Sequence, residues 1–236
     1  MPEIKIQQIE VPVSDGTKMT LHWAGPAGGR PGPGMIVFQE AFGVNSHIRD
    51  VVARFAAEGF WAAAPELFHR TAAHFEGSYT NFPAVAPHMQ ALTQGTLEAD
   101  GRAAYDWLKS RPTVIPDKIG AIGFCLGGRA AFIANATLPL GAAISFYGGG
   151  IAPDLLPLAG RQYGPLLMFW GGLDQHIPPA KSRAVADALT QAGKNHVHVE
   201  FSDADHGFFC DERRQYQPNA AKEAWGLCLA FLKHRL

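Results

Sequence analysis

The feature that most constrains the fold of this chain is a series of short apolar runs that alternate with helical patterns from Met35 onward. Strands buried on both faces have this appearance, and strands that alternate with helices favour a mostly parallel sheet flanked by helices. The sequence therefore predicts an α/β fold. The predicted strands of this sheet are residues 35–38, 60–64, 118–123, 142–147, 166–170 and 196–201.

An antiparallel hairpin is predicted to precede the sheet. Its strands are residues 4–13 and 18–24, and the Asp15-Gly16 pair between them is a strong turn signal. The Gly- and Pro-rich segment 25–34 lacks the Gly-Lys-Ser/Thr ending of a phosphate-binding loop, so we interpret it as a surface connection. The predicted helices are residues 48–58, 90–109, 126–135, 180–192 and 218–235.

Residues 69–87 interrupt the alternation with aromatic, Gly, Pro and His residues of no clear period. This pattern predicts an irregular excursion over the edge of the sheet, of the kind that often shapes a pocket. No repeat, low-complexity tract or linker divides the remaining sequence. We therefore expect a single domain over residues 1–236.

Composition excludes several classes of partner. The formal net charge of −1 gives no basic field that would attract nucleic acid or an anionic membrane, so neither is expected. The sequence shows no signal peptide and no apolar run approaching the ~18 residues of a membrane span. Its 3 cysteines are too few for a disulfide framework. We expect a cytoplasmic protein with reduced thiols.

The segment Gly123-Phe124-Cys125-Leu126-Gly127-Gly128 has the form of a nucleophile elbow in which a thiol replaces the usual serine. A predicted strand precedes it and a predicted helix follows it, which is the context that this turn requires. Glycines two residues before and after the nucleophile let the strand and helix approach closely. Taken alone, the motif is equally consistent with a buried core thiol beside two turn glycines.

Other polar residues follow the predicted strands, where the carboxyl ends of a parallel sheet gather ligands. Cys125, Asp174 and His206 occur in the order nucleophile, acid, histidine, which is the order of the α/β-hydrolase triad. In this interpretation His206 takes the thiol proton and Asp174 orients the ring. The helix that begins at Leu126 would favour the thiolate through its dipole.

Each of these residues has a plainer interpretation. Asp174 could cap the following helix, and His206 could be a turn residue beside Gly207. His176 lies near Asp174 and is a reserve candidate for a base or a substrate contact. His196 and His198 share one strand face, but no third ligand with metal-site spacing accompanies them, so no metal site is predicted.

Three segments together resemble the dienelactone hydrolases, also called carboxymethylenebutenolidases. They are Gln39-Glu40-Ala41-Phe42-Gly43-Val44-Asn45, the cysteine elbow, and Gly171-Gly172-Leu173-Asp174. The resemblance implies an α/β-hydrolase fold without a large lid and a Cys125, His206, Asp174 triad that needs no cofactor. It also implies that Glu40 contacts the resting thiol and helps to move its proton. The oxyanion hole is expected from the backbone N–H groups of Leu126 and Ala41.

The chain departs from the family in its arginines. The family holds a substrate carboxylate with two arginines, but this chain has none between Gly77 and Gln94. Cys210 stands near the place of the second arginine, and Arg213 lies further along. An apolar and aromatic pocket is expected instead, which favours a neutral or bulkier substrate. Its expected members are Phe42, Tyr79, Phe82, His88 and His176, with Phe75 and Met89 on the same wall.

The leading hypothesis is a hydrolase of lactones or activated carboxylic esters that acts through an acyl-enzyme. Its substrate would be a small molecule, and the protein a monomer or small homo-oligomer. One alternative is a broad-specificity carboxylesterase or thioesterase with the same residues. Another is a non-catalytic binding or redox-sensing module in which Cys125 is oxidised or occluded.

Overall fold

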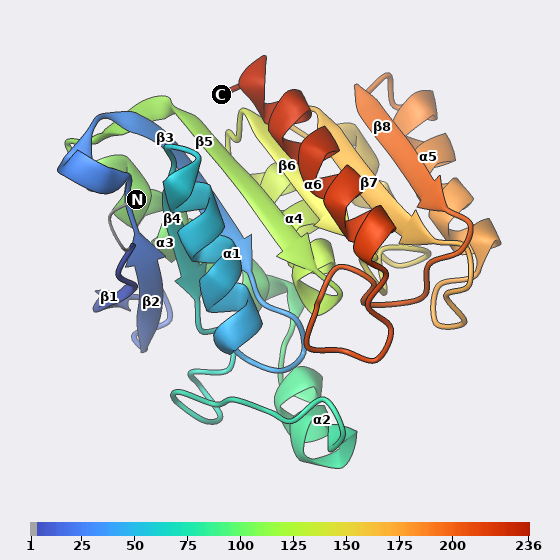
Figure 1. Cartoon of the computed structure of the whole chain (residues 1–236), viewed down its shortest axis with the longest axis horizontal. Coiled ribbons are helices and arrows are strands. Elements are labelled where there is room, and N and C mark those ends of the chain that lie inside the picture. Colours follow the sequence, from blue (N-terminus) through green and yellow to red (C-terminus); the bar gives the residue numbers. More distant parts are fainter. Residues whose placement is uncertain (1–3) are drawn as a thin grey trace.

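The computed structural model describes residues 4–236, which form an eight-stranded sheet with helices on both faces. The strand order is β1-β2-β4-β3-β5-β6-β7-β8, which puts β5, the strand before the elbow, inside the sheet (Figure 1). The strands are β1 (Gln7–Pro12), β2 (Lys18–Ala24), β3 (Gly32–Phe38), β4 (Trp61–Pro65), β5 (Val114–Phe124), β6 (Ala142–Phe146), β7 (Leu166–Gly171) and β8 (His196–Phe201).

The sheet is antiparallel at its first edge and parallel beyond it. β1 pairs with β2 and β2 with β4 in antiparallel register, whereas β4, β3, β5, β6, β7 and β8 run parallel. The predicted hairpin is confirmed, and Gly16 takes a φ of 87° in its turn. The mostly parallel sheet predicted from the apolar runs is also confirmed.

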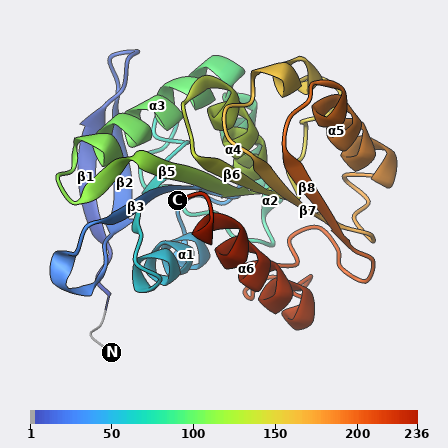
Figure 2. The same cartoon turned by 90° about the horizontal axis from the view of Figure 1, so that it is seen from above.

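Helices cover both faces of the sheet. Viewed from above, α1 and α6 lie on one face and α3, α4 and α5 on the other (Figure 2). α2 belongs to neither layer and lies beyond the carboxyl ends of the strands (Figure 1). The helices are α1 (Ser46–Ala57), α2 (Phe82–Gln90), α3 (Gln94–Ser110), α4 (Leu126–Thr137), α5 (Pro179–Gln191) and α6 (Pro218–Lys233). None of the helices within residues 4–236 is long and apolar enough to cross a membrane.

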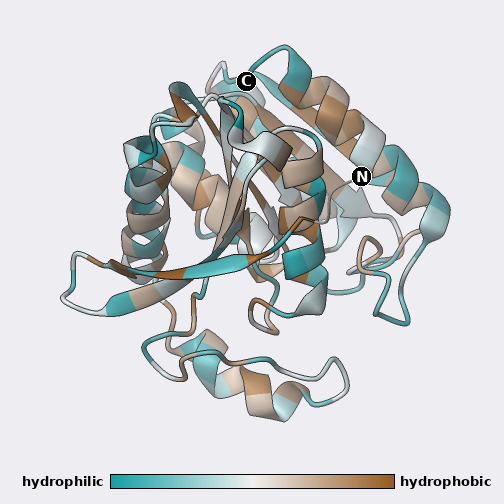
Figure 3. Ribbon diagram, turned by 60° about the vertical axis from the view of Figure 1, so that its left-hand side comes forward, coloured by the Kyte–Doolittle hydropathy of each residue, from teal (hydrophilic) through white to brown (hydrophobic). Residues whose placement is uncertain are grey.

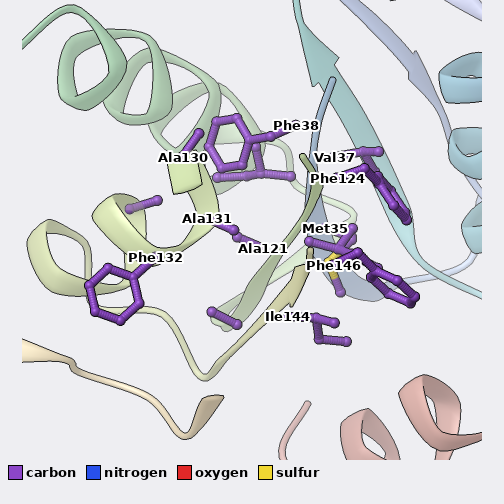
Figure 4. Close-up of a cluster of buried hydrophobic side chains, with 14 of the residues drawn as sticks. Met35, Val37, Phe38, Ala121, Phe124, Ala130, Ala131, Phe132, Ile144 and Phe146 are labelled. Carbon is purple, nitrogen blue, oxygen red and sulfur yellow. The ribbon is translucent and has the colours of Figure 1, made fainter. Parts of the chain in front are cut away.

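The core lies where the central strands meet α4. Side chains of β3, β5 and β6 pack against those of α4, as the close-up in Figure 4 shows. Phe38 and Phe132 are fully buried on the α4 side of the sheet, and Phe124 and Phe146, which pack on Phe209, are fully buried on the opposite side. Burial of a large apolar side chain stabilises the fold by about 1.5–3 kcal/mol. The elbow thus follows a strand that the core holds on both faces.

Two strands begin earlier than the sequence predicts. β3 begins at Gly32, inside the segment interpreted as a connection, and β5 begins at Val114. The helix predicted over 90–109 begins later, at Gln94 of α3, because the Thr93 hydroxyl accepts a hydrogen bond from the Thr96 amide and caps the helix there.

The stretch predicted to be irregular contains α2. Pro83 lies in its first turn, where a proline is tolerated, but Pro87 lies inside the helix and hides the helical pattern. This helix, below the body of the protein in Figure 3, carries both hydrophobic and hydrophilic residues. Val85 is its one buried residue.

Candidate active site

The elbow has the backbone geometry that its glycines predicted. Cys125 takes a φ of 55°, a backbone conformation that residues other than Gly rarely adopt, and it immediately precedes α4. A Cβ atom at Gly123 would overlap the Gly127 carbonyl, and one at Gly127 would overlap the Phe38 carbonyl. Both glycines are therefore required by close backbone contacts. The thiol is only partly buried, unlike those of Cys210 and Cys228.

His206 and Asp174 come together at the ends of β8 and β7. The His206 Nδ1 donates a hydrogen bond of 2.7 Å to one carboxylate oxygen of Asp174. The other Asp174 oxygen accepts from the amides of His176 and Ile177 at 2.7 and 3.0 Å. One carboxylate thus holds the turn before α5 and fixes the orientation of the His206 ring.

The surroundings of His206 strongly favour its protonated form. Burial alone would lower the pKa of this imidazole, but hydrogen bonds and charge interactions with Asp174 and Cys125 outweigh it and raise the pKa to about 10. For Asp174, burial opposes ionisation, and the hydrogen bonds from His206 and the two amides lower its pKa overall. The ring thus bonds Asp174 directly and lines the same cavity as Cys125.

Leu126 and Ala41, whose backbone amides the sequence predicted to form an oxyanion hole, lie beside the elbow and the cavity that it faces. Leu126 is the first residue of α4, so its N–H has no acceptor within the helix. Ala41 follows β3 and lines the same cavity as Cys125. In the described part of the chain, neither amide donates to another protein group.

Glu40 is fully buried and forms an ion pair. One carboxylate oxygen accepts a hydrogen bond of 2.9 Å from Arg213, and the other has no partner among the described residues. Gly207 makes room for this pair, because a Cβ atom there would overlap the Arg213 guanidinium. The Glu40 charge is therefore compensated by Arg213.

A cavity of about 360 Å³ lies beside Cys125 and His206, and we call it the elbow cavity. Cys125, His206, His176 and Arg213 contribute its polar groups. Phe42 from the loop after β3 and Phe82 and Met89 from α2 form an apolar wall. Of the pocket residues expected from sequence, Phe42, Phe82 and His176 thus line the cavity.

Tyr79 and His88 are not part of this lining. Tyr79 packs edge-on against Phe42 from behind, and its hydroxyl accepts hydrogen bonds from Asn45 and the Cys210 thiol. His88 bonds the Thr71 hydroxyl and packs on Phe75. Tyr79 precedes α2 and packs on Phe42, and α2 contributes Phe82 and Met89, not His88, to the lining of the elbow cavity.

Arg213 lies further along the sequence than the family's second substrate-binding arginine, so the sequence did not identify it as a site residue. The structure places it in the elbow cavity, whereas Arg70 binds Asp15 and Asp100 elsewhere. A signal was available, because a buried carboxylate such as Glu40 requires a cationic partner.

Two groups of side chains in residues 4–236 have the spacing of metal ligands, and both lie outside the triad. One is His22, Glu66 and His74, and the other is His47, Cys210 and Asp211. Burial and the charge of Glu40 raise the pKa of the Cys210 thiol to about 12, which disfavours its thiolate as a ligand. His196 and His198 belong to neither group.

Comparisons with known proteins agree with this geometry. Residues 19–236 match the model of the dienelactone hydrolase family. The chain is 35% identical over 94% of its length to a Synechocystis sp. protein named "Putative carboxymethylenebutenolidase", covering 94% of that protein. An Azospirillum brasilense protein of the same name is 32% identical, with 97% of this chain and 98% of that protein covered.

A solved structure gives the same fold. The crystal structure titled "Putative Dienelactone Hydrolase" from Klebsiella pneumoniae superposes with a TM-score of 0.89 at 29% identity, covering 98% of this chain and 99% of that one. The sheet order and flanking helices described above are thus those of an α/β-hydrolase fold. The chain belongs to the dienelactone hydrolase family and is a hydrolase of the carboxylic ester class.

Proposed function

We propose that this enzyme opens lactones or cleaves activated carboxylic esters through a Cys125, His206, Asp174 triad. The observation that carries the proposal is the His206 ring, which is bonded to Asp174 at 2.7 Å and shares the elbow cavity with the Cys125 thiol. The substrate is a small molecule, since the cavity measures about 360 Å³.

The reaction proceeds in two halves. The Cys125 thiolate attacks the carbonyl carbon, and the resulting oxyanion accepts hydrogen bonds from the Leu126 and Ala41 amides. The intermediate expels the alcohol oxygen, which takes a proton from His206 and leaves a thioester on Cys125. His206 then removes a proton from water, which attacks the thioester and restores the thiol. Asp174 stabilises the imidazolium without taking its proton.

Glu40 is proposed to receive the proton of the resting thiol. Its unpartnered oxygen is free to accept that proton, while its other oxygen is held by Arg213.

The substrate class follows from the cavity and the leaving group. A thiolate leaves a tetrahedral intermediate easily, so alkyl esters would revert and enol or phenol esters would react forward. Glu40 compensates the charge of Arg213, and Phe42, Phe82 and Met89 present apolar surface. We therefore propose that neutral enol lactones and aryl esters are preferred over anionic ones.

The test is to trap the acyl-enzyme. Mixing the protein with p-nitrophenyl acetate and quenching within one turnover is expected to add one acetyl group to the peptide that holds Cys125, measured by mass spectrometry. The Cys125→Ser variant should lose the thioester, and Cys228→Ser, a buried cysteine remote from the elbow, should keep it. An unmodified Cys125 during turnover would refute the proposed nucleophile.

A panel of substrates separates the alternatives. Turnover of p-nitrophenyl esters without turnover of enol lactones would favour a broad carboxylesterase or thioesterase. The apolar wall of Phe42 and Phe82 is consistent with this alternative. Ligand binding without any turnover would favour a binding or redox-sensing module.

A further inference from the structure

A second cavity, separate from the elbow cavity, lies beside the antiparallel end of the sheet. It measures about 390 Å³ and is lined on one side by His22, Glu66 and His74. One ligand atom from each of these side chains lies within 4.8 Å of the other two. The proposed hydrolysis uses none of them.

The register of the sheet places two of the three side chains. His22 on β2 is opposite Ala64 on β4, and the Glu66 amide donates to the Thr20 carbonyl, so the ladder continues past the end of β4. His22 and Glu66 therefore lie on the same face as diagonal neighbours. The His22 Nε2 and the Glu66 Oε1 are 2.7 Å apart, and both side chains are at most 7% exposed.

His74 comes from the loop between β4 and α2. Its φ of 57° is a left-handed conformation that few residues other than Gly adopt. This backbone turns the ring onto Glu66, where Nδ1 is 2.9 Å from the same Oε1 atom that His22 contacts. The imidazole is 63% exposed, so its position is fixed by these contacts and not by burial.

The three atoms have almost the spacing of ligands around one ion. Bonds of about 2.0–2.1 Å from zinc to nitrogen and oxygen put neighbouring ligand atoms roughly 3 Å apart. Two imidazoles and one carboxylate are a ligand set that zinc uses, with water in the remaining position. We propose that His22, Glu66 and His74 form a binding site for a divalent ion of the zinc type, open to water on the cavity side.

Gln8 supplies the outer partner that such a site needs. It is the register partner of His22 across β1 and β2, and its side-chain amide is 3.4 Å from His22 Nδ1. When His22 Nε2 binds the ion, the ring proton moves to Nδ1, and rotation of the Gln8 amide presents its oxygen as the acceptor. His74 binds through Nδ1 and keeps its proton on Nε2, toward solvent.

The ion would also strengthen a connection to the elbow cavity. The loop that carries His74 continues to Gly77, whose amide donates to the Phe42 carbonyl at 3.0 Å. Phe42 is part of the apolar wall. Zinc at this site would therefore tie the loop before α2 to β2 and β4.

Zinc binding is best measured by calorimetry in the full-length Cys125→Ala protein, where the elbow thiol cannot bind the metal. We expect one zinc ion bound at this site and at least about tenfold weaker binding after His74→Gly. Glycine suits the positive φ, so this variant should fold. His234→Ala, which removes an exposed histidine of the last turn, should bind zinc as the parent does.

Thermal unfolding gives a second readout. Zinc should raise the unfolding temperature of the parent but not that of the His74→Gly variant, because a ligand stabilises only the fold that binds it. Absence of zinc binding at millimolar concentration, or equal affinity and stoichiometry in the parent and His74→Gly, would overturn the proposal and leave the trio as a hydrogen-bonded anchor for the loop.

Discussion

The triad candidates at the ends of the strands and the apolar wall of the elbow cavity are held in place in very different ways. Asp174 and His206 are 4% and 8% exposed and are joined by a hydrogen bond, and Cys125 is fixed by the crossing of two glycine backbones. Phe82 on α2, by contrast, is 52% exposed, and α2 buries only Val85. The difference indicates that the sheet holds the proposed reacting groups firmly, whereas the proposed substrate wall is held by few buried contacts.

The largest effect is expected at the strand ends. In the Asp174→Asn variant, an amide N–H2 group would face His206 Nδ1 and force the wrong ring tautomer, so kcat should fall by about 10³–10⁴-fold. The fall in kcat can be measured by stopped-flow or steady-state kinetics with an aryl ester. Asp50→Asn, at an exposed position of α1, is the matched control and should keep full activity. Retained activity in Asp174→Asn would remove Asp174 from the triad.

The pH dependence of stability tests the same region independently of activity. The pKa of His206 is raised to about 10 in the folded chain from about 6.5 unfolded, so the native state holds its proton more tightly. This contribution is complete below pH 6.5 and is lost as pH rises through 10. Between these values the free energy of unfolding should fall by about 1 kcal/mol or more relative to a His206→Gln variant.

Urea unfolding at several pH values provides the measurement. The Cys125→Ala variant should show a smaller fall than the wild type, because the elbow sulfur contributes to the raised pKa. Parallel curves for wild type and His206→Gln would contradict the proposed environment of the ring.

The Glu40→Gln substitution tests how the ion pair at the strand ends controls the charge of the elbow cavity. It leaves the Arg213 charge uncompensated in the elbow cavity, so the ratio of kcat/KM for p-nitrophenyl hemisuccinate over the neutral butyrate should rise by roughly tenfold, about 1.4 kcal/mol. A ratio separates this electrostatic effect from any loss of proton transfer, which would lower both rates. Glu76→Gln, which breaks an ion pair with Arg49 outside the cavity, should leave the ratio unchanged.

The smallest effect is expected on the wall. Phe82→Ala should raise KM for an aryl ester by about two- to fivefold and leave kcat almost unchanged, because only part of this ring's apolar surface would be buried against the substrate. Unfolding should be unaffected, since the ring is 52% exposed. Tyr163→Ala, another exposed aromatic, is the control. A large fall in kcat would mean that α2 also positions the reacting groups.

The strand-end residues were predictable because the sheet imposes their positions. An apolar run ends at a defined edge, so Cys125, Asp174 and His206 could be brought together from their order and context alone. The glycines of the elbow were predictable for a related reason, since a turn that sharp tolerates no side chain at Gly123 and Gly127.

The wall was less predictable because its geometry depends on packing between distant segments. Pro87 obscured α2, and without the helix axis the face that carries Phe82 and Met89 could not be distinguished from the one that carries His88. Arg213 was set aside on spacing, yet its side chain reaches Glu40 across a turn that the sequence does not specify. Long side chains on irregular loops lack the periodicity that identifies a buried face.

The position of β5 inside the sheet, between β3 and β6, has a consequence for local opening. Amide hydrogens of residues 120–123 of β5, which pair on both sides, should exchange with solvent only through global unfolding, whereas those of α2, with one buried residue, should exchange through small local fluctuations. Local opening of α2 would thus leave undisturbed the strand that leads to Cys125, the proposed nucleophile.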